Sequence, residues 1–82
     1  MSTRVWSPKV GGIPYTVVVR WNPWTFAGEL VVDGKVIRTW GLRMAGPDIN
    51  FKIEDHSASV KKTPMGFDLY VDEQKIRSKE QQ

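Results

Sequence analysis

The sequence predicts an all-β protein, a small antiparallel β-sandwich of seven to eight short strands built from hairpins. In residues 29–38, apolar β-branched side chains flank one Asp-Gly pair, the strongest short-range hairpin signal. Turn signals also recur about every 8–12 residues, and no helical apolar period persists. The 82 residues have room for one domain, 1–82, with one core. We place that core at about 5–77 and expect 78–82 to be a flexible charged tail.

The hairpin at 29–38 has a near-copy at 68–77. The two copies align Leu30 with Leu69, Asp33 with Asp72, Ile37 with Ile76 and Arg38 with Arg77. The second copy has Glu73 where the first has Gly34, and glycine is the residue that best tolerates the positive φ of a tight turn. We therefore expect the second turn to be looser or longer than the first.

The N-terminal part of the chain predicts a short strand followed by a longer one. Val5–Trp6 is expected to form a short edge strand, and Pro8 and the pair Gly11-Gly12 then predict a mobile loop. Residues 15–21 form the clearest strand, because polarity alternates along it. Its expected inward face carries Tyr15, Val17, Val19 and Trp21.

The central hairpin is expected to pair residues 26–32 with residues 35–42. A strict two-residue loop places Leu30 opposite Ile37, whereas a bulge at Gly34 shifts the pairing by one residue. The sequence leaves both registers open.

The second half of the chain predicts four further strands, at 49–54, 57–62, 67–71 and 75–77, with turns at 45–48, 55–56 and 63–66. Alternation assigns these side chains to the inner face: Ile49, Phe51, Ile53, Ala58, Val60, Phe67, Leu69 and Val71.

Composition narrows the class of protein. The chain has no cysteine, which excludes disulfides, cysteine zinc sites and a thiol nucleophile, and which fits a reducing compartment. No apolar run approaches the length of a membrane span and the N-terminus lacks a signal-peptide core, so we expect a soluble cytoplasmic protein with no membrane contact. The net charge of +3 is an ordinary charge for solubility.

The order of these motifs resembles the Fas apoptotic inhibitory molecule family. The resemblance rests on the Val-Val-Asp-Gly-Lys turn at 31–35, Trp40, the strand containing Phe51 and the segment 67–72. It runs from about Val5 to Arg77. Members of that family carry two such β-domains in tandem, and this chain is similar to the first. The resemblance implies a non-catalytic β-sandwich that acts through protein contacts, and it supplies no catalytic or partner-binding residues to transfer.

Residue types that could support catalysis or metal binding have simpler explanations. His56 lies between Asp55 and Ser57, but neighbouring residues in a turn point in different directions and cannot act as a triad. Gly11-Gly12 lacks the remainder of a phosphate-binding loop. The acidic residues lack the spacing of a calcium loop: Asp33, Asp48, Glu54, Asp55, Asp68 and Asp72. We therefore predict no enzyme activity, no cofactor and no metal.

Three tryptophans with nearby arginines support an alternative function. Aromatic and basic side chains on a β surface bind single-stranded nucleic acid, and aromatic platforms also bind carbohydrate. Trp21 and Trp40 are expected in the core, which leaves Trp24, in the turn after Asn22-Pro23, as the exposed one. We rank this alternative second. The residues concerned are Trp21, Trp24, Trp40, Arg20, Arg38 and Arg43.

The function predicted from sequence is a protein-interaction module with an unidentified protein partner. The predicted partner contacts are Trp24 and the hairpin residues Asp33, Gly34 and Arg38. Edge strands of a sandwich can also pair with another chain, so we expect a homodimer by edge-strand pairing as one outcome.

Overall fold

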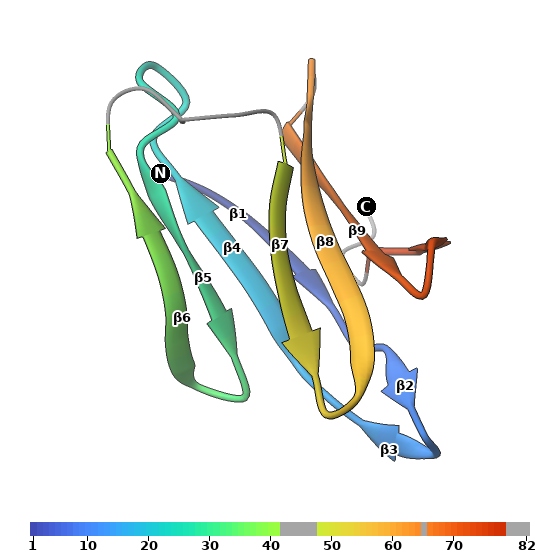
Figure 1. Ribbon diagram of the computed structural model, residues 1–82. Helices are drawn as coiled ribbons and strands as arrows, with labels where there is room; N and C mark the ends of the chain where they lie inside the picture. The colour runs from blue at the N-terminus through green and yellow to red at the C-terminus, as the bar shows by residue number, and fades with distance from the viewer. Residues whose placement is uncertain (42–47, 65, 79–82) are drawn as a thin grey trace.

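The computed structural model describes residues 1–41, 48–64 and 66–78. In these ranges the chain forms ten strands and no helix (Figure 1). The strands are β1 (Ser2–Trp6), β2 (Lys9–Val10), β3 (Ile13–Pro14), β4 (Val17–Trp21), β5 (Gly28–Val32), β6 (Lys35–Trp40), β7 (Asp48–Ile53), β8 (His56–Thr63), β9 (Gly66–Val71) and β10 (Gln74–Ile76). The predicted turn at 45–48 and the predicted strand end at Leu42 lie largely outside the described residues.

Eight of the described strands build two four-stranded antiparallel sheets that lie face to face (Figure 1). The first sheet has the order β1-β4-β5-β6, and the second has the order β10-β9-β8-β7. The predicted antiparallel β-sandwich is confirmed. The remaining two strands, β2 and β3, form a ribbon of their own. The loop expected around Gly11-Gly12 is instead the tight turn of this ribbon, because both glycines adopt positive φ and Val10 pairs with Ile13.

Alternation along the strands correctly predicted the core. The inward residues assigned to β4, β7, β8 and β9 are buried, whereas Tyr15 is only partly buried and precedes β4. Trp6, at the end of edge strand β1, is also buried. The centre of the aromatic packing is Phe67, whose ring lies 5.1 Å from that of Trp21 and 5.7 Å from that of Trp40 between ring centroids.

The two similar hairpins have turns of the same length. In the first, Val32 pairs with Lys35, and Asp33 and Gly34 have φ of +50° and +81°. In the second, Val71 pairs with Gln74 around Asp72 and Glu73, which have φ of +52° and +68°. The expectation of a looser second turn is wrong. Pairing of β9 with both β8 and β10 fixes the register, so Glu73 adopts a left-handed conformation that a glycine would adopt without steric cost.

A third turn begins one residue earlier than predicted. Ile53 pairs with His56, so Glu54 and Asp55 form the turn and His56 begins β8. Glu54 takes the positive φ that the turn requires, at +55°.

The central hairpin contains a bulge, but not at Gly34. Val31 pairs with Val36 as a two-residue loop requires, and the register then shifts between Leu30 and Val31 so that Leu30 faces Arg38. Neither predicted register holds along the whole hairpin. The extra residue is Ile37, which is displaced from the position opposite Leu30.

Replacing Glu73 by glycine should stabilise the protein. A non-glycine residue in the left-handed region costs about 1–2 kcal/mol, and the greater freedom of glycine in the unfolded chain offsets part of this gain. We expect the free energy of unfolding in urea to rise by about 0.5–1 kcal/mol. The matched control is Gly34→Glu, which should lower it by a similar amount, because a Cβ at Gly34 meets no atom within 4 Å and only the backbone conformation is tested. Equal stabilities of wild type and Glu73→Gly would contradict the prediction.

Candidate functional site

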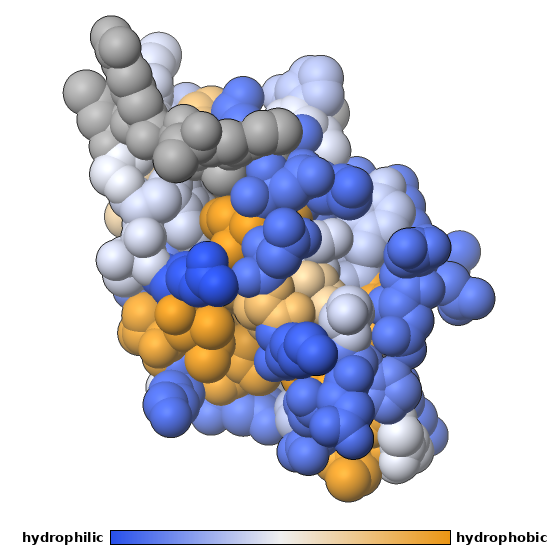
Figure 2. All heavy atoms as spheres, viewed as in Figure 1, coloured by the Kyte–Doolittle hydropathy of each residue, from blue (hydrophilic) through white to orange (hydrophobic). Residues whose placement is uncertain are grey.

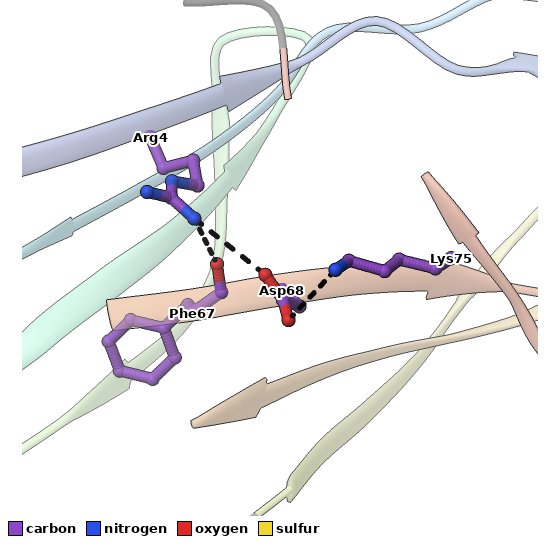
Figure 3. A network of polar contacts seen from close by, with 4 residues as sticks. All are labelled: Arg4, Phe67, Asp68 and Lys75. Atoms are coloured by element: carbon purple, nitrogen blue, oxygen red, sulfur yellow. Dashed lines mark hydrogen bonds and ion pairs between the residues drawn. The ribbon is translucent and has the colours of Figure 1, made fainter. Parts of the chain in front are cut away.

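On one side of the sandwich, which we call the closed side, several contacts join β1 to the second sheet around a hollow of about 390 Å³. Trp6 forms a β-bridge with Ser78, the first residue of the predicted flexible charged tail, whose other residues, 79–82, lie outside the described residues. Arg4 Nη1 donates to the carbonyl oxygen of Phe67 at 3.3 Å and lies 3.7 Å from Asp68 Oδ1 (Figure 3). Lys75 Nζ lies 3.7 Å from the other oxygen of Asp68. These contacts link the edge of the first sheet to β9 and β10.

The opposite side of the sandwich, between β6 and β7, is open. Across this opening, Arg38 Nη2 donates a hydrogen bond to the carbonyl oxygen of Asn50 at 2.9 Å. A hollow of about 540 Å³ lies here. We call it the edge groove, and it is lined by Ile37, Arg38, Asn50, Phe51, Lys52, Ser57 and Ala58.

The bulge in β6 accounts for the open side. It places Arg38 opposite the buried Leu30, where an uninterrupted register would have placed Ile37. A guanidinium at this position extends to the opposite sheet instead of filling the core. Along β6 the residues from Lys35 to Thr39 are all exposed. Val36 is 51% and Ile37 38% exposed, and Figure 2 shows a hydrophobic patch over the lower part of β6.

The backbone of β7 has hydrogen-bonding groups along this opening that are not paired with another described strand. The carbonyl oxygen of Ser57, the β8 residue opposite Lys52, accepts from Asp72 N at 2.8 Å and so points toward β9. Backbone groups in an antiparallel pair alternate between the two sides of a strand, so those of Lys52, Asn50 and Asp48 point away from β8. The bond from Arg38 to the carbonyl of Asn50 agrees with this assignment. The outer edge of β7 therefore has three residues whose backbone N–H and C=O groups can pair with another strand.

The predicted partner contacts do not form one surface. Trp24 is 90% exposed in the loop before β5, whereas Asp33 and Gly34 form the turn after β5, at the other end of that strand. The carboxylate of Asp33 accepts from the backbone N–H of Thr16 at 2.7 Å, which joins the turn to the residue that precedes β4. Arg38 is the predicted contact residue that lies at the edge groove.

Sequence reasoning missed Asn50 and Lys52. Alternation predicts that both lie on the outer face of a half-buried strand, but it gives no information about which strands lie at a sheet edge.

The aromatic and basic residues of the alternative function are dispersed. Trp21 is buried, and Trp40 is half-buried with its Nε1–H donating to the carbonyl of Phe26 at 2.6 Å. Arg20 Nη1 forms an ion pair with Glu29 at 2.8 Å. Arg43 lies outside the described residues. A stacking surface built from these three tryptophans would therefore depend on Trp24.

The single histidine has a partner other than its sequence neighbours. His56 Nδ1 lies 2.6 Å from Asp72 Oδ2, in the turn of the second hairpin, so the residues beside it in sequence do not orient the ring. Within the ranges that the structure describes, no three His, Asp or Glu side chains are grouped so as to hold a metal ion. In the same ranges no helix is long and apolar enough to cross a membrane.

Comparisons of the chain with protein-family models, with curated proteins and with solved structures find no match. The resemblance to the Fas apoptotic inhibitory molecule family therefore stays a prediction from sequence.

Tyr15 gives a testable pH effect at the end of the sandwich near Glu54. Its hydroxyl donates to Glu54 Oε2 at 3.0 Å. Desolvation, this hydrogen bond and the negative charges of Glu54 and Asp33 raise the pKa of Tyr15 above its ordinary value of 10.0. The unfolded chain therefore loses this proton at lower pH than the folded chain, and stability falls as pH rises above 10.0.

Urea unfolding at a series of alkaline pH values measures this effect. The Tyr15→Phe variant should lose less stability between about pH 9 and about pH 11 than wild type, because the other titrating groups are unchanged. Equal pH dependence in the two proteins would show that the environment of Tyr15 does not favour its neutral form.

Proposed function

We propose that the protein is a non-catalytic interaction module that binds an extended segment of a protein partner along the outer edge of β7. The observation that carries this proposal is that backbone groups of β7 without a partner strand lie beside the edge groove. An added strand gains affinity from main-chain hydrogen bonds and specificity from pockets that receive alternate side chains. The closed side is less suited to an added strand, because Ser78 already bridges to β1 there.

The groove defines the chemistry of the bound segment. Ile37, Phe51 and Ala58 provide apolar lining. A segment with an apolar residue at every second position would direct those side chains toward the lining. Binding requires Arg38 to release the carbonyl of Asn50, and a hydrogen bond from a charged group such as this guanidinium is worth at most about 1.5–3 kcal/mol.

The similarity in motif order to the Fas apoptotic inhibitory molecule family supports a role in protein contacts without catalysis. The absence of cysteine supports a reducing compartment, and we extend the proposal to a cytoplasmic protein.

Selection of random linear peptides displayed on phage tests the proposal. Peptides selected on the wild-type protein should have apolar residues at alternate positions. The variant Asn50→Pro removes an N–H that points away from β8, so it blocks strand addition without removing a β7–β8 hydrogen bond. We expect it to weaken peptide binding by roughly tenfold or more.

Asn50→Thr is the matched control, because it changes the same side chain and keeps the N–H. Thermal melting of both variants shows whether each remains folded. Selected peptides that bind Asn50→Pro and wild type equally, or a selection that enriches no peptide, would overturn the proposal.

Nucleic acid or carbohydrate binding at Trp24 is the second candidate, supported by the exposure of this side chain. Titration of tryptophan fluorescence with a single-stranded oligonucleotide at low and moderate salt tests the nucleic-acid form of it. We expect no salt-sensitive quenching, because Arg20, the basic residue on nearby β4, is paired with Glu29. Salt-sensitive quenching that is lost in Trp24→Ala would favour this candidate over the interaction module.

A further inference from the structure

We propose that the segment bound along β7 is β7 of a second copy of this chain. The two strands run antiparallel about a twofold axis at Asn50, so that Asp48 lies opposite the partner's Lys52. The two second sheets thereby become one continuous sheet. This inference rests on the proposed function, since it names the partner for the same edge.

The edges of the two sheets differ in how they are protected against pairing. Proteins limit edge pairing with bulges, charges that point inward, very short strands, or a covering segment. On the first sheet, β1 is bridged by Ser78, and β6 has a bulge together with Lys35 and Arg38. On the second sheet, β10 has only three residues.

The strand β7 lacks these protections apart from its own charged side chains, Asp48 and Lys52. It has six residues, pairs with β8 without a register shift, and contains no proline or glycine. At its outer edge, Arg38 donates one exposed hydrogen bond to the carbonyl oxygen of Asn50. Among the described strands, β7 is thus the edge where an added strand meets the least obstruction.

The charges along β7 match those of a second β7 in antiparallel orientation. Its outward residues are Asp48, Asn50 and Lys52, with opposite charges at equal distances from Asn50. Pairing centred on Asn50 puts each of the two Asp48 side chains opposite a Lys52 of the other copy. Opposite charges directly across a strand pair are stabilising, and like charges are destabilising.

The backbone permits this register but does not by itself select it. Hydrogen-bonded pairs require outward-pointing groups on both strands, and these belong to Asp48, Asn50 and Lys52. A register centred on Phe51 also meets this requirement, but it places Asp48 opposite the partner's Glu54 and so brings two carboxylates together twice. Centring on Asn50 avoids this repulsion.

Displacement of Arg38 is the cost of this pairing. The carbonyl that accepts from Arg38 is the one that would accept from the N–H of the partner's Asn50. Removing the guanidinium with Arg38→Ala should therefore strengthen the dimer, by a few-fold in the dissociation constant.

Sedimentation equilibrium over a range of protein concentrations tests the pairing through a charge exchange. Asp48→Lys and Lys52→Asp should each weaken self-association by about tenfold or more, because each puts like charges opposite one another twice. Mixing the two variants should restore a dimer, now a heterodimer, because every pair across the axis is again of opposite charge. Lys35→Asp on β6 is the control, with the same change of charge at the other exposed edge, and should associate as wild type does.

Folding of the variants is checked by thermal melting, since Asp48 Oδ2 also lies 3.4 Å from Lys61 Nζ. Lys52 lies opposite the uncharged Ser57, so Lys52→Asp breaks no ion pair with β8. This variant alone therefore tests the register if Asp48→Lys proves unstable.

The results separate this inference from the proposed function. A wild-type protein that stays monomeric at the highest concentration while selected peptides bind β7 would overturn the self-pairing and leave the interaction module in place. A dimer unaffected by Asn50→Pro and by the charge exchange would overturn the self-pairing as well. Restoration of association on mixing the two charge variants, and its loss in Asn50→Pro, would establish the paired edge.

Discussion

The packing of Phe67 between the two sheets is the contact on which the rest of the structure depends. This fully buried residue of β9 brings its ring against Trp21 of β4, Trp40 of β6 and Phe26, so it joins the second sheet to two strands of the first. Aromatic pairs of this kind contribute about 0.5–1.5 kcal/mol each beyond the area they bury. The neighbouring Gly66 shows how tight the packing is, because a Cβ there would lie 2.8 Å from Cζ2 of Trp21.

Polar contacts distinguish the two sides of the sandwich. Two arginines of the first sheet, at its opposite edges, both bond to main-chain carbonyls of the second sheet. Arg4 does so beside Asp68 and next to the bridge from Trp6 to Ser78, so the sheets are joined there by several contacts. Arg38 is linked to Asn50 by one exposed hydrogen bond, with a groove around it. Arginine therefore bonds to a main-chain carbonyl on both sides, but further contacts support Arg4, whereas the single hydrogen bond of Arg38 can be displaced.

The sequence predicted the buried faces well, because apolar and polar side chains alternate along β4, β7, β8 and β9, and this local pattern follows from the burial of one face of each strand. It predicted the turn at Asp33 and Gly34 for the same local reason. It failed where distant pairing decides the conformation. Glu73 is left-handed because β9 is held on both sides, and Ile37 is an extra residue because β6 must pair with β5 at both ends of a bulge. The hydrogen bond of Asp33 was not predicted, because its carboxylate accepts from the N–H of Thr16, a residue that becomes a neighbour only on folding.

The free edge of β7 shows why the candidate site could not be derived from the same pattern. The alternation of Asp48, Asn50 and Lys52 with apolar residues is typical of any half-buried strand, and only the sheet order makes β7 an edge. At a sheet edge, the charges of β7 also influence which strands can pair with it. A lysine on an exposed edge discourages pairing with most strands. The same lysine favours a strand that places a carboxylate opposite it, and β7 itself, reversed, has Asp48 at that position. A charge that protects against unspecific association can thus select one partner strand over others.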